Sequence, residues 1–233
     1  MLAFDGYPFL QYLISRLIGL NFDEILIITG WLSQGVEIVF KNEFWRSRGV
    51  RIVEGNAFWK TGEVIKFALK HSSNEDVFLC NGDTVVDMDF CEFYKIHTSR
   101  CADFTSVLSL NKGVQNEGAV FARNDIVIEF AEGRKPRTPF LGRISIRGSS
   151  TGCYFLKRSV LLDIFPSGLF SFEYDILPYL VSKGLLTATS NGNKFFLDYG
   201  VPERYQVLKK KSWILRKIYG NPMSKGEHDE KRH

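Results

Sequence analysis

Short apolar runs alternate with amphipathic segments along the first part of the chain, and this alternation limits the folds that the sequence can adopt. Each run is continuously apolar and bounded by turn residues, which indicates a strand covered on both faces. Strands are expected at residues 24–30, 50–55 and 78–83, and helices at 8–19, 32–40 and 61–71. Such alternation builds βαβ units, so we predict a Rossmann-like layered α/β fold around a mixed, mainly parallel sheet.

The pattern changes after Cys101. "DFTSVLSL", "GAVFARND" and "IVIEF" predict strands in quick succession, which indicates a small antiparallel extension beside the parallel sheet. Residues 150–165 return to strand and helix, 172–184 predict a helix, 193–200 a strand, and 202–219 a last helix. We expect one domain over residues 1–220 and a mobile polar tail over 221–233, which has almost no apolar anchors.

Composition excludes several classes of protein. A chain of 233 residues with 45% hydrophobic residues can bury a core, and a net charge of +4 is too small to argue for a nucleic-acid partner. No run is apolar for long enough to span a membrane, and we expect no signal peptide. The cysteines show neither zinc-site spacing nor disulfide-scaffold density, so we expect reduced core or near-core thiols in a cytoplasmic protein. They are Cys80, Cys91, Cys101 and Cys153.

Two aspartates follow apolar strands in the same way. Asp83 comes after the run that ends at Cys80, and Asp198 ends the run "KFFLD" before Gly200. Aspartates at the carboxyl ends of parallel strands can point into one crevice, where an oxygen-rich pair suits a Mg²⁺ ion that also holds a phosphate. The alternative is that both aspartates only cap a turn or the helix that follows.

Several segments occur together in a recognisable order. "LCNGDT", "FEYDILP" and "FLDYGVPERY" follow "DGYPFLQYLISRL", "FDEILIITGW" and "VEGNAFWKTGEVIKFAL". By these segments, from about Asp5 to Tyr205, the chain resembles the sugar-1-phosphate nucleotidyltransferase family, and most closely its heptose-1-phosphate and mannose-1-phosphate guanylyltransferase branches. The resemblance implies the three-layer nucleotidyltransferase fold of that family.

The resemblance also implies a reaction. A nucleoside monophosphate would pass from an NTP, with GTP favoured, to a sugar 1-phosphate of the heptose or mannose type, giving an NDP-sugar for lipopolysaccharide or capsule synthesis and pyrophosphate. Asp83 and Asp198 match the family's catalytic aspartates and would hold Mg²⁺. The sugar phosphate is already an anionic nucleophile, so catalysis is alignment and charge neutralisation, without a general base.

Further residues carry over from the family's motifs. Nucleotide binding is implied for Thr61, Gly62, Asn81 and Gly82, and sugar-phosphate binding for Gly118, Glu132, Lys135, Gly152 and Glu173. A glycine permits a close approach of backbone, and a carboxylate can accept hydrogen bonds from vicinal sugar hydroxyls. For the two glutamates, a surface salt bridge is the alternative interpretation.

The chain departs from the family at its beginning. It starts after the family's first strand, its glycine-rich "GG.GTRL" loop and its "PKP" lysine, which cradle the triphosphate. We therefore expect a sheet without its first strand, and weak binding and near-background turnover for residues 1–233 alone. A misplaced start codon, a real truncation and a decayed gene all stay open.

Two other functions are weighed against the enzyme. The first is a catalytically impaired sugar-nucleotide-binding homologue or subunit, which would keep the aspartates without the triphosphate loop. The second and weaker is a glycosyltransferase, whose paired acids would have to come from "VDMD" at residues 86–89. The expected partners are an NTP and a sugar 1-phosphate, with no nucleic acid and no membrane span, and a homo-oligomer is allowed for.

Overall fold

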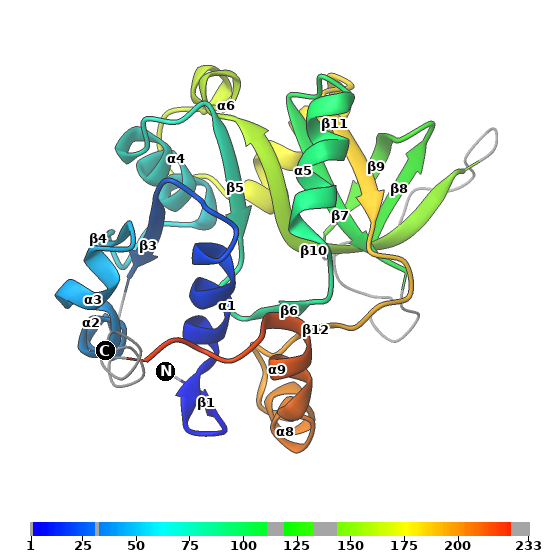
Figure 1. The fold of residues 1–233 in the computed structure, drawn as a ribbon. Coiled ribbons are helices and arrows are strands. Elements are labelled where there is room, and N and C mark those ends of the chain that lie inside the picture. Colours follow the sequence, from blue (N-terminus) through cyan, green and yellow to red (C-terminus); the bar gives the residue numbers. More distant parts are fainter. Residues whose placement is uncertain (1, 31–32, 111–118, 133–143, 225–233) are drawn as a thin grey trace. The chain divides into compact units, whose positions relative to one another are not determined.

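The computed structural model describes residues 2–30, 33–110, 119–132 and 144–224 (Figure 1). The chain divides into two compact units. Unit 1 combines Met1–Phe58 with Tyr199–His233, and unit 2 is Trp59–Asp198. Both the expected single domain over residues 1–220 and the mobile tail stay predictions. In the described part of the chain, no helix is long and apolar enough to cross a membrane.

Unit 1 contains a parallel strand pair and a group of helices. Its strands are β1 (Ala3–Phe4), β2 (Tyr7–Pro8), β3 (Ile25–Thr29) and β4 (Val50–Glu54), with β3 parallel to β4. Its helices are α1 (Phe9–Ile18), α2 (Gln34–Phe40), α3 (Glu43–Arg46), α8 (Pro202–Lys210) and α9 (Trp213–Tyr219). Phe9 packs edge-on against Tyr199 and Tyr219, which ties α1 to the returning chain.

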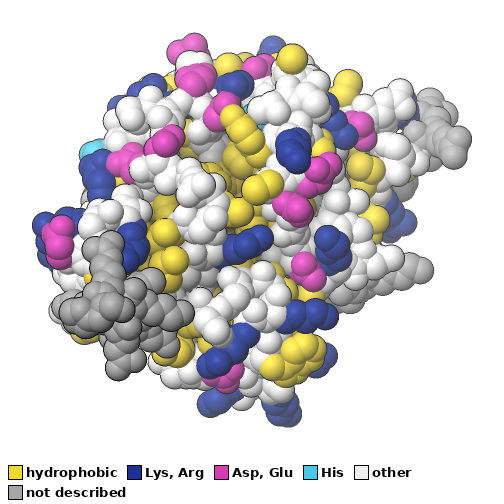
Figure 2. All heavy atoms as spheres, in the orientation of Figure 1, with side chains coloured by type: hydrophobic (Ala, Val, Ile, Leu, Met, Phe, Trp, Pro, Cys, Tyr) yellow, Lys and Arg dark blue, Asp and Glu magenta, His cyan; other side chains and the backbone are white. Residues whose placement is uncertain are grey.

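The last expected helix is two helices. Lys211 leaves the helical region with φ −120° and ψ 27°, and α9 starts with new hydrogen bonds from Ile214 N and Leu215 N. Lys209 and Lys210 lie in the last turn of α8, where positive charges are favourable beside the carbonyl groups that end a helix. Basic side chains gather over α8 and α9 (Figure 2). Leu208 of α8 and Leu215 of α9 are buried.

Unit 2 is built on a six-stranded sheet with the order β5-β10-β7-β11-β9-β8. Its strands are β5 (Asp76–Cys80), β7 (Phe104–Ser109), β8 (Ala119–Arg123), β9 (Ile126–Ala131), β10 (Ile146–Lys157) and β11 (Leu186–Ser190). The long strand β10 pairs with β5, β7 and also β8, so five strands close into a ring. A bulge between Ser150 and Tyr154 lets β10 bend between these partners.

The prediction of a mainly parallel sheet is not confirmed by the described pairings. Only β3–β4 and β7–β11 are parallel, and the other pairs are antiparallel. β5, expected as a parallel strand, runs antiparallel to β10. The antiparallel extension is confirmed and is larger than expected, because tight turns such as Asn124–Asp125, both with positive φ, join its strands directly. The expected absence of a first strand stays a prediction.

Helices cover both faces of this sheet. On one face, α5 (Phe90–Ser99) lies across β5, β10 and β7 (Figure 1), and Phe93 packs on Phe155. The opposite face carries the main hydrophobic core of the unit, which includes Leu156 and Leu108. There the strands pack against α4 (Thr61–His71), α6 (Arg158–Ile164), the π-helix η2 (Phe172–Ile176) and α7 (Leu177–Ser182). Because successive side chains of a strand point to opposite faces, each strand contributes residues to the packing on both faces of the sheet.

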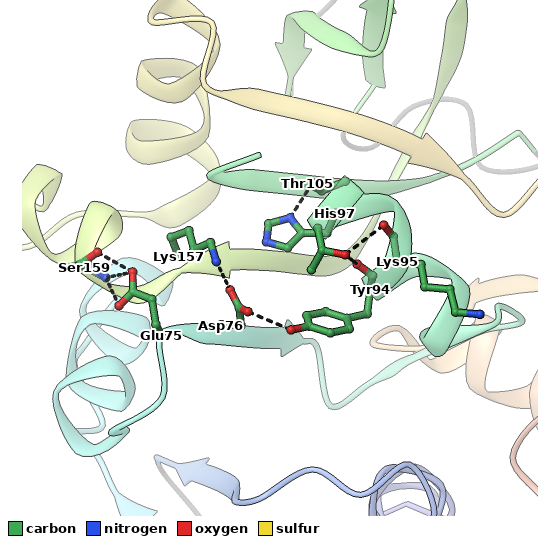
Figure 3. Close-up of polar contacts among 9 residues, drawn as sticks. Glu75, Asp76, Tyr94, Lys95, His97, Thr105, Lys157 and Ser159 are labelled. Atoms are coloured by element: carbon green, nitrogen blue, oxygen red, sulfur yellow. Dashed lines mark hydrogen bonds and ion pairs between the residues drawn. The ribbon is translucent and has the colours of Figure 1, made fainter. Parts of the chain in front are cut away.

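A polar network lies beside α5 (Figure 3). Asp76 accepts hydrogen bonds from Lys157 and from Tyr94. Burial alone would raise the Asp76 pKa, but these two hydrogen bonds outweigh it and the pKa is lowered. Glu75 accepts a hydrogen bond from Ser159 at the start of α6. These contacts link the beginning of β5 to the end of β10.

His97 is completely buried in the same region, and its tautomer follows from its neighbours. Thr187 donates to the Phe104 carbonyl, so its hydroxyl oxygen accepts from Thr105, whose oxygen in turn accepts from His97 Nδ1 at 2.8 Å. The imidazole therefore carries its proton on Nδ1. Its Nε2 has no hydrogen-bond partner among the described residues. Burial lowers the pKa of His97, which keeps the ring neutral.

Candidate functional site

Asp83 and Asp198 lie at neighbouring ends of two short strands. β6 (Thr84–Val86) begins directly after Asp83, and β12 (Phe196–Asp198) ends at Asp198. The two strands are antiparallel, and Asp198 is the Cα partner of Thr84. The structure brings the two aspartates together across an antiparallel pair and not, as expected, at the carboxyl ends of parallel strands. In an antiparallel pair, the end of one strand lies beside the beginning of the other.

The electrostatics of the pair favour a bound cation. Partial burial raises the pKa of the Asp83 carboxyl, and the negative charge of Asp198 raises it further. A hydrogen bond from Thr84 Oγ1, 3.3 Å from Asp83 Oδ1, only partly offsets this. Asp83 as a residue keeps contact with solvent, and Asp198 is half-buried. Two partly desolvated like charges repel each other, and a cation between them would remove that repulsion.

The donor set fits a hard cation that is also held by a substrate. Two aspartates supply only oxygen ligands, which Mg²⁺ prefers, and Mg²⁺ usually combines one or two carboxylates with phosphate and water oxygens. Within the described ranges no group of three or more His, Cys, Asp or Glu side chains is placed to hold a metal by itself. The pair therefore suits a metal shared with a nucleotide better than a structural metal.

Asn81 and Gly152 touch at the foot of this turn. Asn81 N donates to Gly152 O at 3.2 Å, and Gly152 has a positive φ of 72°. A Cβ atom on Gly152 would lie 2.5 Å from the Asn81 side-chain nitrogen. Only glycine fits at this position without moving Asn81. Packing against Asn81 therefore requires a glycine at position 152, whose expected role was to contact a sugar phosphate. Gly152 also supports the turn that carries Gly82 and Asp83.

Thr61 and Glu173 are directly hydrogen-bonded. Thr61 Oγ1 and Ser171 Oγ both donate to Glu173 Oε2, the second at 2.9 Å. Phe172 N donates to Thr61 Oγ1 at 3.0 Å, which fixes the start of α4 against η2. The sequence predicts Thr61 beside the nucleotide and Glu173 beside the sugar, and the structure places them in one cluster. Ser171 was not predicted, although its position just before Glu173 at the start of a helix is a usable signal.

Gly62 is buried under an aromatic ring. A Cβ atom added to it would lie 2.3 Å from the Phe170 ring and 2.6 Å from the Phe170 carbonyl oxygen. The close contact here is between α4 and the segment that leads into η2. The need for a glycine is therefore explained by protein packing, and a contact with a nucleotide stays a prediction.

Tyr154 connects the cluster to the bulge of β10. Its hydroxyl lies 2.8 Å from Ser150 Oγ, and its ring packs edge-on against Phe172. Burial raises the pKa of the Tyr154 hydroxyl, and the charges of Glu173 and Glu132 raise it further. Both glutamates therefore act on the same hydroxyl, which stays protonated at neutral pH. The expected residues Gly118 and Lys135 lie outside the described residues.

The described part of the chain thus combines a closed mixed sheet, helices on both faces of it, and a pair of adjacent aspartates. The profile of the family described as "Nucleotidyl transferase" matches residues 1–212. The chain belongs to this family.

Relatives of known activity lie within the same family. The chain is 29% identical over 213 residues to D-glycero-alpha-D-manno-heptose 1-phosphate guanylyltransferase of Aneurinibacillus thermoaerophilus, covering 90% of this chain and 87% of that protein. It is 25% identical to mannose-1-phosphate guanylyltransferase of Mycobacterium tuberculosis, over 99% of this chain and 62% of that longer protein. The crystal structure of HddC from Yersinia pseudotuberculosis complexed with GMP-PN is similar, with a TM-score of 0.73 and 26% identity over 91% of this chain and 88% of that one.

Proposed function

We propose that the chain transfers a nucleoside monophosphate from GTP to a sugar 1-phosphate of the heptose or mannose type and releases pyrophosphate. The aspartate pair at the ends of β6 and β12 is the observation that carries the proposal, because it is a ready site for a metal–nucleotide complex. Guanine and these sugars are favoured because two relatives are named as guanylyltransferases of heptose 1-phosphate and mannose 1-phosphate.

The reaction requires alignment more than acid–base chemistry. An oxygen of the sugar phosphate attacks the α-phosphorus of GTP, and the bond from that phosphorus to the pyrophosphate oxygen breaks. The nucleophile is already anionic, so no residue has to remove a proton. A Mg²⁺ ion held here would supply the positive charge that neutralises the triphosphate. Asp83 and Asp198 would be its protein ligands, and their fixed strand ends would orient the nucleotide.

Glu173 is prepared to bind a sugar hydroxyl. Both hydroxyl donors, Thr61 and Ser171, bond to Oε2, and within the described residues Oε1 accepts no hydrogen bond. A carboxylate held by one oxygen presents the other in a fixed direction, which reduces the entropy lost on binding. We assign Oε1 to a sugar hydroxyl and Glu132, which acts on the same Tyr154 hydroxyl, to a second contact with the sugar phosphate.

The product would be a guanosine diphosphate sugar for lipopolysaccharide or capsule assembly, made in the cytoplasm. A screen of the protein together with any segment encoded upstream of Met1 tests this assignment. It pairs four NTPs with several sugar 1-phosphates and measures Mg²⁺-dependent pyrophosphate release. The expected result is the highest release with GTP and a heptose or mannose phosphate. Preference for another base or a glucose phosphate would contradict the substrate assignment, and hydrolysis without transfer to the sugar would contradict the reaction class.

A further inference from the structure

Cys80 and Cys153 face each other across two paired strands. Cys80 ends β5, and β10 places Cys153 directly opposite it in antiparallel register. The hydrogen bond from Asn81 N to Gly152 O flanks this pair, so the two cysteines form a pair that is not joined by its own backbone hydrogen bonds. In such a pair the Cα atoms are about 4.5 Å apart and both side chains project from the same face.

This geometry fits a disulfide bond. Disulfides join residues whose Cα atoms are about 4.4–6.8 Å apart, and both cysteines are free thiols in the structure. Burial raises the pKa of the Cys153 thiol, and the neighbouring Cys80 raises it further, which places the two sulfur atoms within electrostatic reach of each other. The pair lies two residues along each strand from Phe78 and Phe155, which are also cross-strand partners.

We propose that Cys80 and Cys153 form a reversible dithiol–disulfide site at the base of the turn that carries Asp83. With a peroxide as oxidant, the Cys80 sulfur attacks one peroxide oxygen, the O–O bond breaks, and a sulfenic acid and water form. Cys153 then attacks the Cys80 sulfur, and a second water leaves as the S–S bond forms. Two thiols and one hydrogen peroxide thus give one disulfide and two waters. Cys80 reacts first because Cys153 is fully buried whereas Cys80 keeps partial exposure.

The position of the pair gives the bond a consequence. It would close the end of the β5–β10 ladder, where Asn81 and Gly152 already touch, and Asp83 follows only three residues after Cys80. The turn would lose freedom of motion. The Cα spacing typical of such a pair is at the short end of the disulfide range, and strained disulfides are readily reduced. Burial raises the pKa of Cys80 to about 12, so little thiolate forms at neutral pH and oxidation is slow.

Intact-mass spectrometry tests the bond directly and does not depend on the proposed function. The full chain with Cys91→Ser and Cys101→Ser retains Cys80 and Cys153 as its only cysteines. Both replaced cysteines are exposed, so their replacement should not disturb the core. After hydrogen peroxide, denaturation and alkylation, the expected product carries no alkyl groups, has lost about 2 Da and yields one peptide pair linked through Cys80 and Cys153. Dithiothreitol should restore two alkylated thiols. Two alkylated thiols after complete peroxide treatment, or separate sulfinic acids without a link, would overturn the proposal.

Hydrogen exchange tests the coupling to the turn. In the oxidised protein, the backbone amides of residues 81–84 are expected to exchange several-fold more slowly than in the reduced protein. Adding Cys80→Ser or Cys153→Ser to the same background should abolish the response to peroxide. If Cys80→Ser or Cys153→Ser prevents folding, the exchange rates of the oxidised and reduced forms of the Cys91→Ser, Cys101→Ser protein still test the restraint. Equal exchange in those two states would refute the restraint on the Asp83 turn.

Discussion

At the residue scale, the like charges of Asp83 and Asp198 dominate the electrostatics of the candidate site. The Asp83 pKa is raised by partial burial and by Asp198, so without a cation the charge of Asp83 is unfavourable in the folded state at neutral pH. A carboxyl with a raised pKa binds its proton more tightly in the folded state than in the unfolded chain. Its charge therefore lowers stability as the pH rises through the unfolded value of 3.8 and the folded value.

Asp198→Asn should stabilise the metal-free protein. Removing one like charge lowers the pKa of Asp83, and the gain is roughly 0.2–1 kcal/mol at neutral pH because solvent screens the pair. Urea unfolding with a chelator measures it. The difference from the parent protein should shrink as the pH falls and Asp83 becomes protonated, because the repulsion then disappears. A loss of stability at neutral pH would show that the two charges do not repel.

Glu173→Gln should weaken sugar-phosphate binding selectively. The lost charge-assisted hydrogen bond corresponds to roughly 1.5–3 kcal/mol, so the KM for the sugar phosphate should rise about ten- to a hundredfold while the KM for GTP changes little. Steady-state kinetics of pyrophosphate release, measured on the same extended protein as the substrate screen, separates the two constants.

Thr61 provides the matched control for Glu173. Thr61→Ser keeps the hydroxyl that donates to Glu173 and should leave the sugar-phosphate KM near that of the parent protein. Thr61→Val removes the donor and should shift this KM in the same direction as Glu173→Gln. An unchanged sugar profile in Glu173→Gln would assign the glutamate a purely structural role.

At the element scale, the packing of α4 against the segment before η2 depends on Gly62. Gly62→Ala should destabilise the protein by about 1–3 kcal/mol, because the added methyl group overlaps Phe170 and its carbonyl oxygen. Thermal unfolding measures the effect. Gly30→Ala is the control, since nothing lies within 4 Å of a Cβ atom there and its φ is not positive. Equal melting temperatures for both variants would mean that α4 can move away freely.

Most elements were predictable because their local signals are strong. α1 starts after Pro8, α4 matches residues 61–71, and β3 and β4 match the expected runs within a residue or two. The short strands β6 and β12 show why the geometry of the site was harder to predict from the sequence. The residues of β12 were expected as a strand, but its antiparallel pairing with β6 depends on contacts far apart in sequence.

The exposure of the cysteines and the break in the last helix also could not be predicted from local sequence patterns. Cys80 and Cys153 lie in the sheet as expected, whereas Cys91 and Cys101 are exposed, a distinction that their spacing alone does not contain. The break falls on Lys211, the third of three consecutive lysines, but helical periodicity continues across it. Local patterns indicate which residues form elements, while partners and breaks are decided by tertiary packing.

At the scale of the whole molecule, the two units differ in how well the sequence anticipates them. The parallel pair in unit 1 has the expected direction. The closed ring in unit 2 depends on β10 serving three partners through a bulge at Gly152, and no periodicity in the sequence predicts a strand with three partners. The predicted aspartates and the Thr61–Glu173 cluster all belong to unit 2.

Global stability should fall below pH 6.5 because of His97. Its pKa is lowered by burial, so the unfolded chain binds a proton that the folded protein does not, and stability is lost as the pH falls below 6.5 toward the folded value. His97→Asn keeps a donor for Thr105 without a titrating ring. Its melting temperature should therefore fall less than that of the parent protein between pH 7 and pH 5. If the melting temperatures of the two proteins fell equally between pH 7 and pH 5, groups other than His97 would cause the loss of stability in acid.

The central claim is that Asp83 and Asp198 together hold the cation that binds the nucleotide. Electron paramagnetic resonance of Mn²⁺, titrated into the protein with GTP present, measures this directly. Asp83→Asn and Asp198→Asn should each weaken Mn²⁺ binding by roughly tenfold or more, because each removes one charged oxygen ligand. Asp163→Asn, an exposed aspartate on α6, should bind Mn²⁺ like the parent protein. Unchanged Mn²⁺ affinity in both site variants would contradict the account.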